Sequence, residues 1–265
     1  MNMFLQELKT YRKSTIIWTA SLIGILITVF AMFPSFAKEA EEFKKLLEGF
    51  PEVVRNAIGL QVDTMGSILG YYSYIFTYVV LCGAIQAMNL GTSLLSREVR
   101  EKTADFLLTK PVTRIEVITS KLLAALTSLV ITNIVYLTSA YIVATIIKTD
   151  DFSGKVFLMI SITLFFIQLI FLALGMVLSV LLKRIKSVLP LSLGTVFGFF
   201  IAGMLASTTG DDKLRYLTPF KYFDTSYIMQ NAAYEGTYII IGLIFVLGAI
   251  SATYYIYSKK DIQAL

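Results

Sequence analysis

Residues 156–182 have the sequence VFLMISITLFFIQLIFLALGMVLSVLL and carry no charged side chain. About 20 consecutive apolar residues are enough for an α-helix to cross the hydrocarbon core of a bilayer. A helix also satisfies its own backbone hydrogen bonds, which a segment inside the bilayer must do. The stretch therefore predicts a membrane-spanning helix, and it indicates that the chain is an all-α integral membrane protein.

Five further apolar runs of similar length lie on either side of this stretch. We expect six membrane-spanning helices in all, at about residues 15–33, 71–94, 122–147, 156–182, 188–207 and 237–257. The first run is too long for a cleaved signal peptide, and no small-residue cleavage site follows it. The sequence therefore predicts a single transmembrane domain over residues 1–265.

The composition agrees with a membrane protein and excludes some chemistry. The chain is 56% hydrophobic and only 15% charged, against about 25% charged in a soluble domain. It has no histidine, so it has no imidazole base or ligand. Its single cysteine, Cys82, lies in an apolar run, where a small buried side chain is expected.

The distribution of Lys and Arg predicts the orientation of the chain. If the N-terminus is cytoplasmic, the inner segments contain 14 Lys or Arg and 6 Asp or Glu, and the outer segments have a net charge of −3. Cytoplasmic loops are enriched in basic residues. We therefore expect both termini in the cytoplasm and the chain in the plasma membrane. The net charge of +5 is explained by this topology, so no nucleic-acid partner is expected.

Motifs for nucleotide binding and catalysis are missing from the sequence. The string SGKV at Ser153 lacks the first glycine of a P-loop, and GxSxG, HExxH and CxxC do not occur. The chain is therefore expected to bind no cofactor or metal and not to be an enzyme. Ionisable residues are almost absent from the spans, which argues against an ion-coupled carrier.

Five uncharged polar side chains stand out within the predicted spans. They are Gln86, Asn89, Thr132, Asn133 and Gln168. Such groups often form hydrogen bonds between neighbouring spanning helices. They are also candidates for the wall of a weakly polar path, and the sequence leaves both interpretations open.

The segments expected outside the cell, residues 34–70 and 208–236, are longer than simple turns. In the first, Phe36, Ala40, Phe43, Leu47 and Phe50 form a helical stripe, which predicts an amphipathic helix. The second is rich in aromatic residues, which suit a membrane interface. Both fit packing and anchoring. They also fit a lid, with Pro219, Phe220, Tyr222, Phe223 and Tyr227 as a candidate outer gate.

Two cytoplasmic segments are also predicted, at residues 1–14 and 95–121. Residues 1–14 are expected to form an interfacial helix that leads into the first span. Residues 96–114, SREVREKTADFLLTKPVTR, alternate in charge, and Pro111 ends a first short helix there. Thr113 and Glu116 have the spacing of a capping box for the next helix. The segment is either a solvated loop or a docking element for a soluble partner.

Residues 98–123, EVREKTADFLLTKPVTRIEVITSKLL, resemble the signature region of ABC-2 type transporter permeases. That family has a glutamate, a Gly-Thr-Leu-Glu-like turn, a leucine pair, Pro-Val-Ser/Thr-Arg and then Lys-Leu-Leu. Here Lys102 stands where glycine is usual, and Ala104-Asp105 replaces Leu-Glu. FPEVVRNAIGL (50–60), LTPFKYFD (217–224) and YSKKDI (257–262) also resemble family segments, so the resemblance covers nearly the whole chain.

The resemblance implies a six-helix permease subunit of an ABC exporter. Two separate ATPase subunits would bind ATP and Mg, and a second permease chain, identical or different, would complete the transporter among membrane lipids. The family's coupling region corresponds here to Arg97, Glu98, Glu101, Lys102, Thr103, Asp105, Phe106, Lys110, Pro111 and Arg114. The uncharged, aromatic-rich spans favour an amphipathic or lipid-like cargo over a small ion, and the large outer segments also fit export of a peptide or antibiotic. The alternative is a non-transporting scaffold or sensor subunit of the same fold.

Overall fold

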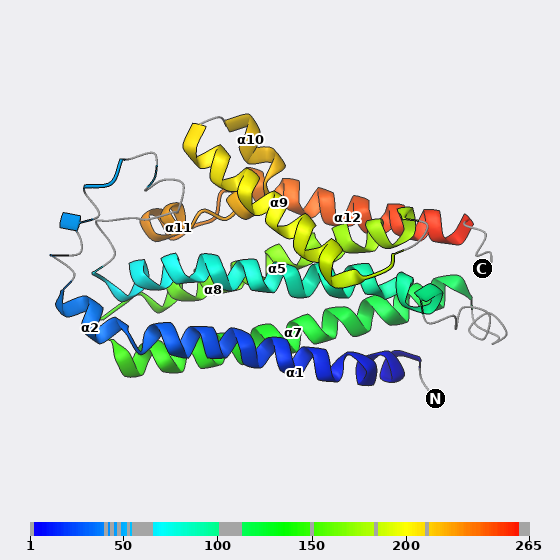
Figure 1. Ribbon diagram of the computed structural model, residues 1–265, viewed down its shortest axis with the longest axis horizontal. Helices are drawn as coiled ribbons and strands as arrows, with labels where there is room; N and C mark the ends of the chain where they lie inside the picture. Colours follow the sequence, from blue (N-terminus) through cyan, green and yellow to red (C-terminus); the bar gives the residue numbers. More distant parts are fainter. Residues whose placement is uncertain are drawn as a thin grey trace.

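The computed structural model describes residues 3–39, 42, 45–46, 49–51, 54, 66–100, 113–148, 151–182, 185–209 and 212–259, without the side chains of residues 98–100, 209 and 212. Within these residues every regular element is a helix (Figure 1). Six of the helices are long and apolar enough to cross a membrane. The predicted all-α fold with six membrane-spanning helices is therefore confirmed.

The long helices form one elongated bundle, and the short helices lie towards the end away from the chain termini (Figure 1). The long helices are α1 (Met3–Phe30), α5 (Ile68–Arg100), α7 (Arg114–Ile147), α8 (Gly154–Leu181), α9 (Val188–Thr209) and α12 (Gly236–Lys259). The short ones are α2 (Phe33–Lys38), α10 (Asp212–Leu217), η1 (Pro219–Lys221) and α11 (Thr225–Asn231). The chain termini, the end of α5 and the start of α7 share one end of the bundle.

Helix α1 runs without interruption from Met3 in the predicted interfacial stretch to Phe30, near the end of the first apolar run. Of the stripe expected in the amphipathic outer helix, Phe36 lies in α2, where its ring centroid is 5.1 Å from that of Tyr71. Ala40, Phe43 and Leu47 lie outside the described residues. The prediction of that outer helix therefore stays a prediction.

Helices α5 and α8 form the centre of the bundle. In their most apolar stretches 67% and 61% of the residues are buried, against 17% in α12. The two central helices pack along each other, α7 packs mainly against α1, and α12 packs against α8. The peripheral helices expose many large apolar side chains, which suits helices that face lipid or another membrane protein.

Two glycines bring the backbones of α5 and α8 into direct contact. A Cβ atom added to Gly91 would lie 2.2 Å from the carbonyl oxygen of Leu172. One added to Gly175 would lie 2.7 Å from the carbonyl oxygen of Met88. Small residues let membrane helices approach this closely and gain dispersion contacts along their length. These two glycines therefore fix where the central helices cross.

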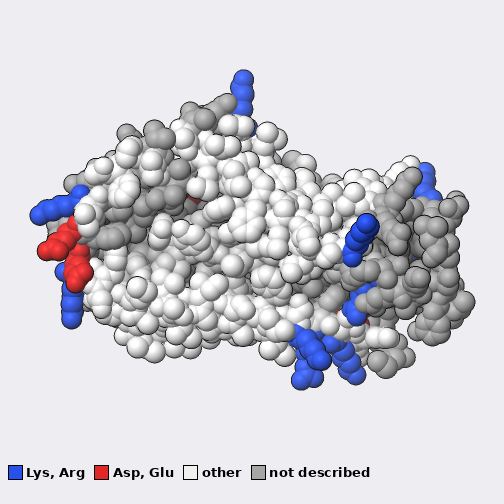
Figure 2. All heavy atoms as spheres, in the orientation of Figure 1, with Lys and Arg blue, Asp and Glu red and all other residues white. Residues whose placement is uncertain are grey.

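On the face shown in Figure 2, most charged side chains of the described residues lie towards the two ends, and the belt between them is largely uncharged apart from one basic side chain at its upper edge. At the end that holds the termini, the visible charged side chains of the described residues are almost all Lys and Arg, whereas the opposite end shows Asp and Glu beside Lys or Arg. The belt matches the predicted membrane-embedded part of the chain, where ionised groups are costly.

Candidate functional site

The first candidate site is the end of the bundle where α7 begins. Thr113 caps this helix: its hydroxyl accepts a hydrogen bond from the Glu116 amide at 3.2 Å. The Thr113 amide in turn donates to the Glu116 carboxylate at 2.7 Å. The structure thus forms the predicted capping box, which pairs two amides that the helix itself leaves free. Helix α7 therefore has a fixed starting point directly after residues 101–112.

An ion pair joins this end of α7 to α1. The Lys121 amine lies 3.3 Å from the Glu7 carboxylate, and the Lys121 side chain is only 1% exposed. A buried charge that loses its partner is strongly destabilising. The pair therefore ties the start of α7 to the start of α1 more firmly than a surface pair would.

Two hydrogen bonds join the same end of α7 to α12. The Arg114 guanidinium donates to the carbonyl oxygen of Tyr257 at 3.3 Å. The hydroxyls of Thr119 and Tyr254 lie 2.9 Å apart. The start of α7 is therefore fastened to both the first and the last membrane-spanning helix.

The structure places only part of the predicted coupling region. Arg97 is half-buried near the end of α5, and Glu98 follows it in the same helix, without a described side chain. Arg114 opens α7. The remaining candidates, Glu101, Lys102, Thr103, Asp105, Phe106, Lys110 and Pro111, lie outside the described residues, so their role stays a prediction.

The second candidate site is a chain of hydrogen bonds through the middle of the bundle. Asn133 Nδ2 donates to Gln168 Oε1 at 2.5 Å, and Gln168 Nε2 donates to Gln86 Oε1 at 3.2 Å. Gln86 Nε2 donates to the Thr132 hydroxyl at 3.1 Å. The Thr132 hydroxyl in turn lies 3.0 Å from the Thr19 hydroxyl. The chain links α8, α5, α7 and α1. Most of the polar side chains predicted in the spans therefore form hydrogen bonds between helices.

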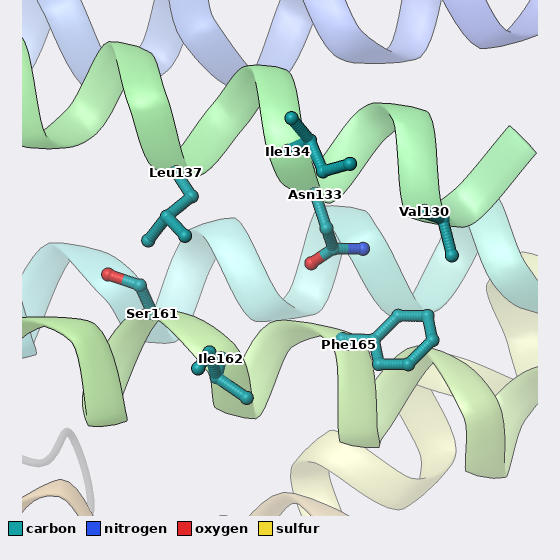
Figure 3. A pocket seen from close by; sticks show the side chains of 7 residues that line it. All are labelled: Val130, Asn133, Ile134, Leu137, Ser161, Ile162 and Phe165. Carbon is teal, nitrogen blue, oxygen red and sulfur yellow. The ribbon is translucent and has the colours of Figure 1, made fainter.

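Asn89 and Asn133 differ from the other members of the predicted set. Asn89 is half-buried on α5, and the described residues place it outside this chain of hydrogen bonds. Asn133 is at the end of the chain and lines a pocket between α7 and α8 with a volume of about 200 Å³ (Figure 3). The structure thus brings Gln86, Thr132 and Gln168 together in the interior and leaves Asn133 at an opening.

A second polar cluster reaches the same pocket. The Tyr72 hydroxyl lies 2.8 Å from that of Ser161 and 3.3 Å from that of Tyr136. All three side chains are buried, and Ser161 also lines the pocket. Hydroxyl groups in so apolar a place are stable because they pair with one another.

The predicted outer gate forms a compact aromatic cluster at the side of the bundle away from the termini (Figure 1). Phe220 lies 5.1 Å from Phe171 between ring centroids, and Tyr222 stacks on Tyr238 at 5.6 Å. Phe223 lies 5.3 Å from Phe166. Among the other two candidates, Pro219 is buried and Tyr227 is exposed. The cluster therefore packs mainly against α8, α9 and α12.

Polar contacts hold this outer cluster in place. The Arg215 guanidinium pairs with the Glu235 carboxylate and lies over the Tyr238 ring, 4.0 Å from its centroid. The Tyr234 hydroxyl donates to the carbonyl oxygen of Met159 at 2.7 Å, and burial raises the pKa of Tyr234 to about 12. Burial lowers the pKa of Lys221. The nearby Asp224 carboxylate raises this pKa by a smaller amount, and the Arg215 guanidinium lowers it further.

A comparison with protein-family models settles the class of the chain. The model described as ABC-2 family transporter protein matches residues 1–262.

The chain belongs to the ABC-2 transporter family.

No curated protein and no solved structure matched it.

The family match confirms the resemblance found in residues 98–123 and extends it over almost the whole chain. An ABC-2 protein of this kind is the membrane-spanning permease subunit of an ABC transporter, a multi-pass membrane protein that works with ATPase partners. It is a component of transport and is not itself catalytic.

Some polar contacts of this ABC-2 permease were missed by sequence reasoning. The partners Glu7 and Lys121 are more than a hundred residues apart, and each lies in a segment with several other charges. Arg215 and Glu235 are 20 residues apart, with the two short helices η1 and α11 between them. The sequence shows these charges among others, and it carries no signal that identifies the partner of each.

Proposed function

We propose that this permease belongs to an exporter whose ATPase subunits dock on residues 96–114. The observation that carries the proposal is the fastening of α7, which begins at the last residue of this segment, to α1 through Glu7 and to α12 through Tyr257. In the proposed orientation this end of the bundle faces the cytoplasm. The gathering of Lys and Arg there supports the orientation (Figure 2).

The arrangement suggests how a docked ATPase would act on the spans. A displacement of residues 101–112 would reach Thr113 and Arg114 first, because they follow in the chain. From there the Glu7–Lys121 pair and the Arg114–Tyr257 bond would carry it to α1 and α12. Because α7 is bonded to both α1 and α12, a movement of α7 would move these two helices with it. Two ATPase subunits and two permease chains would form the complete transporter.

Affinity purification from the native membrane tests the docking proposal. We expect a P-loop ATPase to co-purify with the wild-type chain. Glu98→Lys and Arg114→Glu should each reduce its recovery, because they reverse charges in the proposed docking segment. Lys38→Glu is the matched control, because Lys38 is exposed at the opposite end of the bundle. Full recovery of the ATPase with both docking variants would contradict the assignment.

The proposed orientation has its own test. Cys82 is replaced by Ala, and single cysteines are introduced as Lys38→Cys or Ser258→Cys, at exposed positions near opposite ends. A membrane-impermeant maleimide should label Lys38→Cys on intact cells and Ser258→Cys only after the membrane is opened. The reverse pattern would place the termini outside the cell.

The proposed cargo is an amphipathic peptide, antibiotic or lipid-like molecule. The uncharged spans and the apolar pocket between α7 and α8 support this class. In the reconstituted complex, amphipathic peptides should raise ATPase activity above the basal rate. No response across a broad peptide panel, with the ATPase still bound, would favour the non-transporting scaffold.

A further inference from the structure

The pocket between α7 and α8 has walls that fit an apolar molecule. Figure 3 shows Val130, Ile134 and Leu137 from α7 opposite Ile162 and Phe165 from α8. Asn133 and Ser161 are its two polar residues. Ile134 is 59% exposed, so the pocket opens on the outer surface of the bundle.

The position of the pocket along α7 places it deep in the predicted membrane. Asn133 is 19 residues after Arg114 and 14 residues before Ile147. With a rise of about 1.5 Å per residue, both helix ends are roughly 20 Å or more away. The hydrocarbon core is about 30 Å thick, so the pocket opens near its middle, where no water is available as a hydrogen-bond partner.

The amide of Asn133 has one oxygen left to pair. Its Nδ2 donates to the carbonyl oxygen of Leu129 at 2.8 Å and to Gln168 Oε1 at 2.5 Å. No described residue donates a hydrogen bond to its Oδ1, which is directed into the space between α7 and α8 (Figure 3). A polar atom left unpaired in apolar surroundings costs free energy, so a donor that reaches this oxygen would be favoured.

Ser161, in contrast, already has partners. Its hydroxyl donates to the carbonyl oxygen of Phe157 at 2.8 Å and lies 2.8 Å from the Tyr72 hydroxyl. Asn133 Oδ1 is therefore the polar atom of the pocket that is open to a ligand. None of the lining residues is charged, and an ionised group at this depth would be costly. A neutral ligand suits these walls better than an ion.

We propose that this pocket binds a neutral amphiphile from within the membrane. Its apolar chain would lie against the Ile and Leu walls, and a hydroxyl or N–H group would donate to Asn133 Oδ1. The inference deepens the proposed function, because the same pocket supports the proposed cargo class, but it does not depend on where the ATPase docks. Because Asn133 is linked through Gln168 and Gln86 to α1, a bound ligand would brace four helices together.

Photolabelling of the purified full-length chain tests the proposal. The protein is placed in phosphatidylcholine nanodiscs and labelled with a diazirine derivative of dodecanol or with its methyl ether. The two probes match in length and differ in the hydroxyl donor. One net hydrogen bond corresponds to about a fivefold difference in binding, so the alcohol should label the segments 130–137 and 161–165 about fivefold more than the ether.

A matched pair of variants tests the location. Ile134→Trp fills the pocket, whereas Ile142→Trp places the same side chain two turns further along α7 at an exposed position. The first should abolish labelling by the alcohol, and the second should leave it unchanged. Asn133→Leu should remove the preference for the alcohol over the ether, while some labelling by both remains.

The alcohol should also raise the thermal unfolding temperature of the wild type, and the ether should raise it less. Because Ile134→Trp leaves the hydrogen-bond chain intact, it separates pocket filling from damage to the core. Equal labelling by both probes would show an ordinary lipid chain in the pocket and overturn the proposal. Labelling elsewhere, or labelling that survives Ile134→Trp, would also overturn it. The experiment contains no ATPase, so its outcome leaves the docking proposal untouched.

Discussion

The central and peripheral helices of this permease are held together in different ways. Helices α5 and α8 touch through their backbones at Gly91 and Gly175. The peripheral helices are also joined by polar contacts, such as Glu7 with Lys121 between α1 and α7 and Arg114 with Tyr257 between α7 and α12. The centre therefore combines this close backbone contact with hydrogen bonds such as Gln86 with Gln168, whereas the ties described at the periphery are polar contacts alone.

The difference matters because the two regions look alike in sequence. All six long helices are apolar enough to cross a membrane, and glycines occur in both regions. A Cβ atom on Gly194 or Gly198 in α9 would meet nothing within 4 Å. The space around a glycine, more than its presence, thus separates a helix contact from an open surface.

The largest expected effect comes from breaking the central contact with Gly91→Ala. The new Cβ would collide with the Leu172 carbonyl oxygen, and a backbone atom cannot move aside as a side chain can. We expect a loss of about 4 kcal/mol or more in the free energy of unfolding, because α5 and α8 must separate. Thermal unfolding in detergent measures it.

Gly194→Ala is the matched control for this variant. It adds the same methyl group to a glycine inside a membrane-spanning helix, but into open space. Its effect should stay within about 0.5 kcal/mol. A similar loss in both variants would mean that helix propensity or insertion, and not the close crossing, determines the result.

The next effect tests a peripheral tie with Glu7→Gln. The variant leaves the buried Lys121 amine without its carboxylate, so we expect a loss of about 3 kcal/mol. The double variant Glu7→Lys with Lys121→Glu restores opposite charges and should recover a large part of the loss. Failure of the double variant to recover any stability would contradict a direct pairwise tie.

A smaller effect is expected from the hydrogen-bond chain in the middle of the bundle. Gln86→Leu keeps the approximate volume but removes the donor to Thr132 and the acceptor of Gln168. Hydrogen bonds between membrane helices contribute about 1 kcal/mol each, so the loss should be about 1–2 kcal/mol. The control Thr127→Val removes a hydroxyl that bonds only within α7, to Leu123, and should change stability much less.

The smallest effect concerns Lys221 in the outer cluster. Burial lowers its pKa below the ordinary value of 10.5, so the folded state releases this proton more readily than the unfolded state. Lys221→Met should therefore be more stable than the wild type near pH 7, by up to about 1 kcal/mol. The difference in the free energy of unfolding between the variant and the wild type should narrow as the pH rises towards 10.5. The folded wild type then loses the Lys221 proton before the unfolded chain does, which stabilises the folded wild type. A gap that widens with pH would contradict this assignment.

The sequence was sufficient for the fold class but not for the packing of the helices. Apolar runs such as residues 156–182 predicted the six spans because length and hydropathy alone decide whether a helix can cross a bilayer. Which helices lie at the centre depends on contacts between distant segments. The close approach at Gly91, for example, requires Leu172 opposite it, and a single sequence does not show that pairing.

The candidate sites divide in the same way. The capping box at Thr113 and Glu116 was predictable because its parts are three residues apart. The polar set in the spans was found by its chemistry, yet the sequence could not show that Gln86 and Gln168 pair with each other or that Asn133 opens on a pocket. Those distinctions depend on how the helices are rotated about their axes.

The contact between Gly91 and Gly175 also constrains how this chain can change in length. One inserted or deleted residue turns the following part of an α-helix by about 100°. Between Gly83 and Gly91 such a change would replace glycine at the contact by a neighbour with a side chain, such as Leu90. We therefore expect single-residue insertions to be tolerated in the loops but not in this stretch, so that the central pair keeps one fixed register.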